Sequence, residues 1–175
     1  MGSIWHAEDR FLNVPVAIKL MDRLQAESPQ ATARFEREAL AATAIRSPYV
    51  VQVFDHGVDA GVPFIVMELL AGESLAQRLK RVGRLSPSAA LAILTQVCHG
   101  IGTAHEFNIV HRDLKPGNIF ITNESNVEIV KILDFGVAKR VDSVPSVSGV
   151  ETVSGSLLGT PHYMSPEQLT ETRNI

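Results

Sequence analysis

A short stretch at residues 111–118, HRDLKPGN, gathers three side chains that suit phosphoryl chemistry. The Asp113 carboxylate can accept a hydroxyl proton, the Lys115 ammonium can balance the charge of a phosphate, and the Asn118 carbonyl can bind a hard cation. The Pro-Gly pair before the asparagine predicts a turn that brings the three groups together. For the stretch taken alone, a solvent-exposed turn is a better explanation of the residues than an active site.

Three residues outside this stretch fit the same chemistry. Asp134 opens the motif DFG and would be a second oxygen ligand for a cation. Lys19 ends the strand-like run VAIK, and Glu38 lies in the helical segment that follows it. An ion pair between Lys19 and Glu38 would hold the lysine against phosphate groups. The combination therefore favours a nucleotide site over a plain turn.

Lys19, Glu38, HRDLKPGN, DFG and GTPHYMSPE follow one another along the chain in this order. In this ordered set the chain resembles the catalytic domain of eukaryotic-type Ser/Thr protein kinases, and the bacterial members above all. The resemblance covers nearly the whole chain. It implies the fold class α+β, as a partial two-lobed protein-kinase fold: a small antiparallel β lobe with one helix, followed by the first part of the helical lobe.

In the helical lobe the resemblance makes Asp113 the catalytic base that orients the substrate hydroxyl, and Lys115 the group that stabilises the γ-phosphate. Asn118 and Asp134 would hold Mg²⁺ between the phosphates. The lysine after HRDL marks a Ser/Thr kinase rather than a tyrosine kinase. The implied function is transfer of the ATP γ-phosphate to Ser or Thr hydroxyls of a protein substrate, with ATP and Mg²⁺ as cofactors.

In the small lobe, Lys19 would contact the α- and β-phosphates of ATP, with Glu38 as its partner on the helix. Glu36 is a rival for that pairing, but the wording REAL around Glu38 is the one usual in the family.

The adenine pocket depends on apolar residues, for which a core strand would look the same. Met67 matches the position at the back of the pocket, and the backbone of Glu68 and Leu70 matches the segment that hydrogen-bonds adenine. Gly2 matches the last glycine of the loop that covers the phosphates, and Ile4 matches the β-branched residue that packs on the adenine. The implied nucleotide contacts are Lys19, Glu38, Gly2, Ile4, Ala17, Met67, Glu68 and Leu70.

The loop at 137–160 follows DFG and is rich in Ser, Thr, Val and Gly. In the family, an arginine before the catalytic aspartate, here Arg112, goes with control by phosphorylation of this loop, because a phosphate adds about −1.5 to −2 charges that an arginine can bind. We expect autophosphorylation within Thr152–Ser156. Thr160 is implied to contact the catalytic aspartate. Glu167 matches a glutamate that in the family pairs with an arginine far toward the C-terminus, and we expect it to lack that partner in these 175 residues. The candidate phosphorylation sites are Ser143, Ser146, Ser148, Thr152, Ser154 and Ser156.

The pattern of apolar residues places the elements that must position these groups. Ser28 followed by Pro29 predicts the start of a helix. Gly57 and Gly61 are expected to mark the connection of a hairpin. The predicted elements are strands at 3–9 and 14–20, a helix at 28–45, a hairpin at 50–70, helices at 74–83 and 86–108, and strands at 118–122 and 127–134.

Composition narrows the class of protein. Sixteen basic and nineteen acidic side chains give a net charge of −3, which argues against nucleic acid as a partner because no basic excess is available to neutralise phosphates. No run approaches the ~20 apolar residues of a membrane helix, and no signal peptide is visible. The expected location is the cytoplasm, although the parent protein could be anchored outside this range. Cys98, the single cysteine, is expected to be a buried thiol, and His111 and Phe135 are expected to pack in the core.

The family pattern predicts a partial protein kinase domain over residues 1–175. Residues 1–70 would form the small lobe without its first strand, and 71–175 an incomplete helical lobe with the catalytic and activation loops. We expect the helix at 86–108 to expose an apolar face, and the chain alone to have low stability and little activity. The alternative to an active Ser/Thr kinase is a non-catalytic nucleotide-binding or interaction fragment, inactive because the glycine-rich loop and the rest of the helical lobe are missing.

Overall fold

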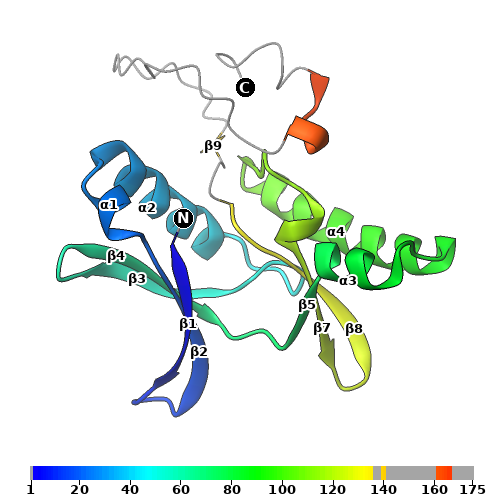
Figure 1. Cartoon of the computed structure of the whole chain (residues 1–175), viewed down its shortest axis with the longest axis horizontal. Helices are drawn as coiled ribbons and strands as arrows, with labels where there is room; N and C mark the ends of the chain where they lie inside the picture. Colours follow the sequence, from blue (N-terminus) through cyan, green and yellow to red (C-terminus); the bar gives the residue numbers. More distant parts are fainter. Residues whose placement is uncertain (1, 136–138, 141–160, 167–175) are drawn as a thin grey trace.

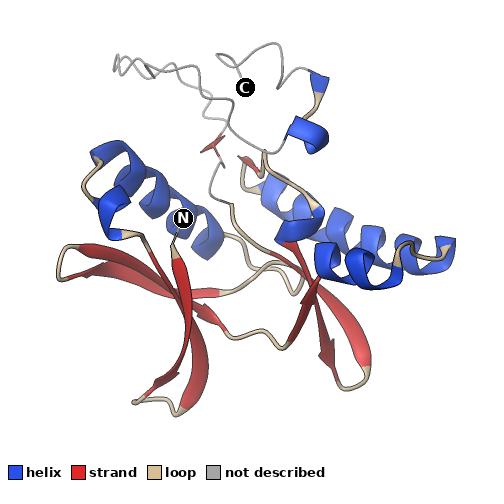
Figure 2. Cartoon of the chain, in the orientation of Figure 1, coloured by secondary structure: helices blue, strands red, loops and turns tan. Residues whose placement is uncertain are grey.

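The computed structural model describes residues 2–135, 139–140 and 161–166. The described residues contain two larger β-sheets, which are both antiparallel and separate from each other. In the view of Figure 2 the helices lie on the same side of both sheets. The first sheet and α1 and α2 come from the N-terminal part of the chain, and the second sheet with α3 and α4 follows (Figure 1). The predicted α+β, two-lobed arrangement is confirmed.

The small lobe is a four-stranded sheet in the order β1-β2-β4-β3, against which α2 packs. The Ser28 hydroxyl oxygen accepts the Ala31 N–H at 3.4 Å, and Pro29 occupies the first turn of α2, as predicted. The core between helix and sheet consists of Met21, Phe35, Ala39 and Ile65. The elements are β1 (Ser3–Asp9), β2 (Val14–Leu20), α1 (Arg23–Ala26), α2 (Pro29–Ala44), β3 (Val53–Asp59) and β4 (Val62–Glu68).

The helical lobe combines a three-stranded sheet, ordered β5-β7-β8, with two longer helices. Ser74 and Gln77 form a capping box that fixes the start of α3. The elements are β5 (Gly72–Ser74), α3 (Leu75–Val82), α4 (Pro87–Glu106), β6 (Ile109–Val110), the 3-10 helix η1 (Pro116–Asn118), β7 (Ile119–Glu124), β8 (Val127–Ile132), β9 (Lys139–Arg140) and the 3-10 helix η2 (Pro161–Tyr163).

The two lobes are joined by the segment between α2 and β3 as well as by the chain after β4. The Ile132 N–H of β8 donates to Tyr49 O at 2.8 Å, and the Val51 N–H donates to Ile132 O at 3.0 Å. Gly100 of α4 packs against this junction, where a Cβ would lie 2.7 Å from Ile132 Cδ1 and 3.1 Å from Tyr49 O. The small lobe is therefore anchored on the strand that leads to Asp134.

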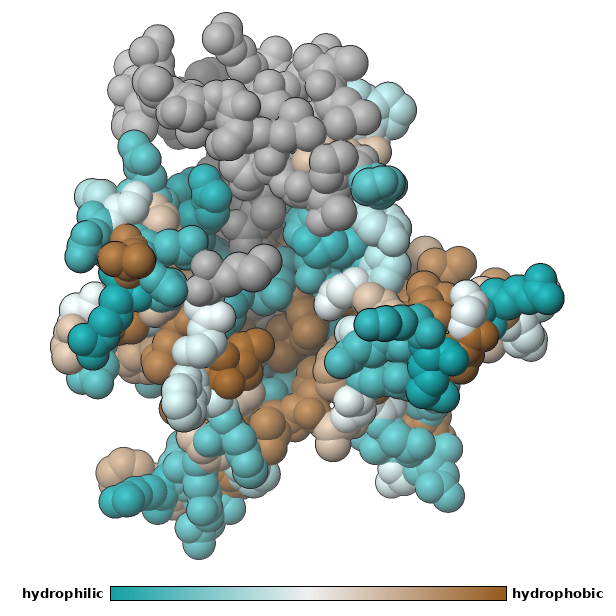
Figure 3. Space-filling model, in the orientation of Figure 1, coloured by the Kyte–Doolittle hydropathy of each residue, from teal (hydrophilic) through white to brown (hydrophobic). Residues whose placement is uncertain are grey.

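Cys98 is exposed, so the prediction of a buried thiol was wrong. The buried residues of α4 are Ile93, Val97, Gly100 and Ala104, spaced by three and four positions along one helical face. Cys98 lies on another face together with Leu91 and Leu94, which are 67% and 54% exposed. The expected exposed apolar face of this helix is thus present among the described residues, and Figure 3 shows hydrophobic surface over α3 and α4.

Two further details of the strands differ from the prediction, one in the β3–β4 hairpin and one in the predicted loop after DFG. The β3–β4 connection lies at Ala60 and Gly61, where Gly61 has a φ of +77°, whereas Gly57 lies within β3 against the Phe64 ring. Part of the predicted loop at 137–160 is a strand, because β9 pairs with β6. No helix within the described ranges is long and apolar enough to cross a membrane.

Candidate active site

Lys19 on β2 connects the two lobes through its ammonium group. Its Nζ donates to Glu38 Oε1 on α2 at 2.5 Å and to Asp134 Oδ1, after β8, at 2.8 Å. The predicted pair with Glu38 is therefore present, and Glu36 is an exposed residue of α2. The side chains of Lys19 and Glu38 are 19% and 13% exposed, and that of Asp134 is 48% exposed. Residues from three distant segments thus form one ion cluster.

The charges in this cluster shift one another's pKa. Burial lowers the pKa of Lys19, but the Asp134 and Glu38 carboxylates outweigh it and leave that pKa above its usual value. Burial raises the pKa of Asp134, but the charge and hydrogen bond of Lys19 act against it, and the net pKa is lowered. For Glu38, burial dominates and its pKa is raised despite the nearby lysine. Lys19 and Asp134 are therefore both charged at neutral pH.

Asp113, Lys115 and Asn118 meet within one turn of the chain, as predicted. Lys115 Nζ donates to Asp113 Oδ2 at 2.7 Å, and Asn118 Nδ2 donates to the Asp113 backbone O at 2.8 Å and to Oδ2 at 3.3 Å. The Asn118 N–H in η1 donates to Lys115 O at 2.9 Å, which closes the turn. The Asp113 side chain is 16% exposed, so this oriented carboxylate is still reached by solvent.

The His111 side chain connects the start of this turn to the backbone of Leu133, the residue before Asp134. Its Nε2 lies 2.9 Å from Leu133 O, and the Asp113 N–H donates to its Nδ1 at 3.3 Å. The two contacts require a neutral ring with its proton on Nε2, and burial lowers the pKa of His111. The ring also packs on Phe135, with the centroids 4.7 Å apart. The predicted core packing of both rings is confirmed, whereas the two hydrogen bonds were not predicted.

The backbone of Leu133 links the two clusters. Its N–H donates to Asn118 O at 2.8 Å, so the residue before Asp134 is tied to the residue that ends the Asp113 turn. Arg112 and Asp134 both have left-handed backbone, with φ of 64° and 56°. Such backbone costs energy for residues other than glycine and persists only where the surroundings hold it. Both residues stand next to, or among, the candidate site residues.

The predicted nucleotide contacts on the strands share one face of the small-lobe sheet. Ile4 lies opposite Lys19 in the β1–β2 pair, and Ala17 lies opposite Met67 in the β2–β4 pair. Paired residues, and alternate residues of one strand, point to the same side of a sheet. Ile4, Ala17 and Met67 therefore lie on the Lys19 side. Ala17 is buried, whereas Ile4 is 67% exposed.

Gly2, Glu68 and Leu70 lie at the ends of these strands. Gly2 comes just before β1, where a Cβ would lie 1.8 Å from Leu20 O, so that no other residue fits without a shift. This close approach is a structural reason for glycine that the sequence did not reveal. Glu68 ends β4, and Leu70 belongs to the connection from β4 to β5.

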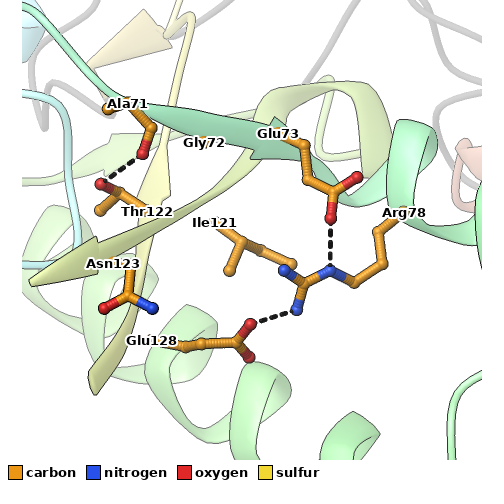
Figure 4. Close-up of a pocket in the computed structure, with 8 residues that line it drawn as sticks. All are labelled: Ala71, Gly72, Glu73, Arg78, Ile121, Thr122, Asn123 and Glu128. Carbon is orange, nitrogen blue, oxygen red and sulfur yellow. Dashed lines mark hydrogen bonds and ion pairs between the residues drawn. The ribbon is translucent and has the colours of Figure 1, made fainter. Parts of the chain in front are cut away.

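A pocket of about 180 Å³ lies elsewhere, in the helical lobe beside β5, β7 and α3 (Figure 4). Arg78 reaches across it, with Nε donating to Glu73 Oε1 at 2.9 Å and Nη1 donating to Glu128 Oε1 at 2.6 Å. None of the predicted nucleotide or catalytic residues lines this pocket. The pocket is therefore separate from the candidate active site.

Asn118 and Asp134 have the donor types that Mg²⁺ prefers. Asn118 uses its amide nitrogen on Asp113, so its side-chain oxygen is the atom suited to a cation, and Asp134 is charged and half exposed. Within the described ranges, no group of three His, Cys, Asp or Glu side chains is placed to hold a metal. Mg²⁺ usually binds one or two protein groups together with phosphate oxygens. The two residues therefore fit Mg²⁺ bound with a nucleotide.

Some predicted residues lie outside the described residues. They are Gly136, the last residue of the DFG motif, and Ser143, Ser146, Ser148, Thr152, Ser154, Ser156, Thr160 and Glu167.

Comparisons with known proteins agree with this geometry. The family model of the protein kinase domain matches residues 1–174. The serine/threonine-protein kinase PknA of Corynebacterium glutamicum is 41% identical over 176 residues, which cover 96% of this chain and 35% of PknA. PknA of Mycobacterium tuberculosis is 39% identical over 173 residues, which cover 96% of this chain and 38% of that protein. This chain thus spans about a third of the length of these curated relatives.

Solved structures match the fold as well. The crystal structure of the Mycobacterium tuberculosis PknI kinase domain superimposes with a TM-score of 0.68 at 28% sequence identity, over 79% of this chain and 56% of that one.

Proposed function

Because the chain belongs to the protein kinase family, we propose that it transfers the γ-phosphate of ATP to Ser or Thr hydroxyls of protein substrates. The observation that carries the proposal is the Lys19 cluster. A charged lysine, supported by Glu38 in the small lobe, reaches Asp134 in the helical lobe. Phosphoryl transfer needs a cation and a metal-binding carboxylate that face each other across the nucleotide phosphates.

Asp113 is the catalytic base in this proposal. Its carboxylate accepts the proton of the substrate hydroxyl, and the contacts from Lys115 and Asn118 hold it in one orientation. The Lys115 ammonium, 2.7 Å from Asp113 Oδ2, lies where it can also neutralise charge on the transferred phosphate.

Lys19 binds the α- and β-phosphates in this proposal. The lysine exchanges its contact with Asp134 for the phosphates and keeps its contact with Glu38. Asp134 is then available, together with Asn118, to bind a cation. Mg²⁺ bound there would neutralise the phosphate charge. Ile4, Ala17 and Met67 contact the adenine, the backbone of Glu68 and Leu70 hydrogen-bonds it, and Gly2 lies over the phosphates.

Transfer of labelled γ-phosphate to a mixture of Ser- and Thr-containing peptides tests the proposal. We expect Asp113→Asn to lower the rate by roughly 10²- to 10⁴-fold, the usual contribution of a general base. The matched control is Asp59→Asn, at the exposed end of β3, which should leave the rate unchanged. Equal rates for the parent chain and Asp113→Asn would contradict the proposal. Binding of Mg-ATP without any transfer would support the non-catalytic alternative.

The loop after DFG is proposed as a substrate of the chain itself. We expect phosphate on Thr or Ser within Thr152–Ser156 after incubation with Mg-ATP, and none in the Asp113→Asn variant. Mass spectrometry of the digested protein locates the modified residue. Modification confined to other residues would contradict this part of the proposal.

A further inference from the structure

Gln96 on α4 is a half-buried polar side chain that the proposed reaction does not use. Its Oε1 accepts the Val130 N–H at 2.9 Å, and its Nε2 donates to Glu128 O at 3.2 Å. Both partners are backbone groups of β8, two residues apart. One side-chain amide thus makes a pair of hydrogen bonds with β8 of the kind that a neighbouring strand would make.

These two hydrogen bonds lie along the free edge of β8. The strand is the last one in the β5-β7-β8 sheet, so its other edge pairs with β7. Farther along the free edge, the Ile132 N–H donates to Tyr49 O. An open strand edge leaves backbone donors and acceptors without partners. Gln96 supplies such partners to the part of β8 that precedes Ile132.

The contacts of β8 with the small lobe form a different set. The Lys131 Nζ donates to Glu68 Oε1 at 2.9 Å, and Glu68 ends β4 of that lobe. Gln96 instead joins two elements of the helical lobe, α4 and β8. Its hydrogen bonds therefore bear on the internal geometry of the helical lobe.

The rest of the contact between α4 and β8 is apolar. Ile93 and Val97 of α4 belong to one core cluster with Val130 and Ile132 of β8. Apolar packing holds two elements together without a strong directional preference. Hydrogen bonds weaken steeply when their angle departs from the best one. We therefore expect the Gln96 amide to fix the position of β8 along α4.

The candidate catalytic turn lies between these two elements along the chain. α4 ends at Glu106, and β6 ends at Val110, three residues before Asp113. β7 begins directly after Asn118 and pairs with β8 along its whole length. Asp134 then follows two residues after the end of β8. A contact between α4 and β8 thus joins the two ends of the segment that carries the Asp113 turn.

We propose that Gln96 is a positioning residue, which locks β8 to α4 and so holds the Asp113 turn and Asp134 in their relative positions. The residue acts through the backbone of β8. Its effect on catalysis rests on the proposed function. A misplacement of about 1 Å can lower an enzymatic rate roughly 100-fold, and we expect the loss of this contact to lower kcat about ten-fold. KM for ATP should change far less, because most of the proposed nucleotide contacts lie in the small lobe.

Hydrogen exchange of backbone N–H groups tests the lock without reference to activity. Gln96→Met keeps the length of the side chain and removes both polar atoms. Exchange should accelerate about ten-fold at Val130, and also at Leu133 and Asn118, whose N–H groups donate to Asn118 O and Lys115 O. Gln30→Met, at an exposed position of α2, is the matched control and should change none of these rates.

The pattern of exchange distinguishes positioning from other roles. Faster exchange at Val130 alone would show a purely local contact and would overturn the proposal. The Ile65 N–H in the small lobe reports on the stability of the whole chain, because Ile65 lies in the core between α2 and the sheet. An equal acceleration at Ile65 would show general destabilisation, which also overturns the proposal. If Gln96→Met does not fold, Gln96→Glu carries the test instead.

Gln96→Glu provides a readout that a purely stabilising residue would not move. A protonated carboxyl group can accept the Val130 N–H and donate to Glu128 O, as the amide does, whereas a carboxylate cannot donate. We expect kcat of the folded Gln96→Glu variant, divided by that of the parent chain at the same pH, to rise as the pH falls from about 8 to about 5.5. The same ratio for Gln96→Met should stay constant. A constant ratio for Gln96→Glu would contradict the proposed lock.

Phosphate transfer by the parent chain separates this proposal from the proposed function. If the parent chain transfers no phosphate, the proposed function fails, and exchange at Leu133 and Asn118 alone decides whether Gln96 positions the turn. If the parent chain is active, kcat of Gln96→Met should be about ten-fold below that of Gln30→Met at a temperature where both are folded. Equal kcat values would overturn the positioning role.

Discussion

The two clusters of the candidate site are held in different ways. Asp113, Lys115 and Asn118 lie within six residues of chain, and the backbone of one turn brings them together. Lys19, Glu38 and Asp134 come from β2, α2 and the end of β8, so only the packing of the two lobes brings them together. The first cluster is a local structure, and the second reports on the arrangement of the whole molecule.

This difference predicts which amino-acid substitutions should disturb each of the two clusters. A change at the junction between the lobes should separate Lys19 from Asp134 while the Asp113 turn stays intact. A change inside the turn should have the opposite effect. Variants that affect both clusters equally would contradict the distinction.

Lys19→Met should produce the largest loss of stability. It leaves the largely buried carboxylate of Glu38 and the half-exposed carboxylate of Asp134 without their cation. We expect a loss of about 3 kcal/mol, with most of it from Glu38 because solvent screens Asp134. Lys115→Met, in the local cluster, should cost less than about 1 kcal/mol because Lys115 is more exposed. Urea unfolding of the two variants measures the difference. Equal losses would show that the cross-lobe cluster has no special dependence on its lysine.

Gly100→Ala should come next. A Cβ at Gly100 would lie 2.7 Å from Ile132 Cδ1 and 3.1 Å from Tyr49 O, so the junction must shift, at a cost of roughly 1–3 kcal/mol. Gly102 on the same helix has no atom within 4 Å of its Cβ position, and Gly102→Ala should stabilise by up to about 1 kcal/mol. Thermal unfolding compares the two. A stabilising Gly100→Ala would show that α4 does not support the junction in this way.

Acidification should have the smallest effect on stability, and it should act through His111, which contacts the first residue of the local cluster. The pKa of His111 is below its usual 6.5 in the folded chain, so the unfolded chain takes up the proton first as the pH falls. The stability contributed by the neutral ring is complete above about pH 6.5 and declines below it, by at most about 1.4 kcal/mol per pH unit. His111→Asn should flatten this dependence in urea unfolding between about pH 7.5 and 5.5. The exposed His105→Asn is the control, and an unchanged slope in His111→Asn would contradict the assignment.

The sequence predicts the local cluster better than the surrounding packing. The turn of HRDLKPGN and the capped start of α2 at Ser28 follow from neighbouring residues, so spacing alone indicates both. The Lys19–Glu38 pair could be predicted only by considering the order of the motifs along the chain. The exposed Cys98 was missed because the apolar content of α4 was considered without its period, which places this residue off the buried face.

Contacts between distant segments could not be predicted from the sequence. Lys131 in a strand-like run gives no indication of its partner, because Glu68 comes near it only when both lobes are formed. The hydrogen bonds of His111 to Leu133 and Asp113 depend on a left-handed residue, Arg112, between them, and the sequence does not show such backbone. Packing between the lobes decides the Lys131–Glu68 contact, and the backbone conformation within the helical lobe decides the hydrogen bonds of His111.

The affinity of Mg-ATP for the parent chain, Lys19→Met and Lys115→Met tests the central claim most directly. We expect calorimetry to show binding to the parent chain and a loss of roughly ten-fold or more in Lys19→Met, because a charge-assisted contact to phosphate is removed. Lys115→Met should lose less affinity than Lys19→Met, because in the proposed function Lys115 balances the charge of the γ-phosphate alone, and chiefly during its transfer. Affinity that does not change in Lys19→Met would contradict the claim that the cross-lobe cluster is the nucleotide phosphate site.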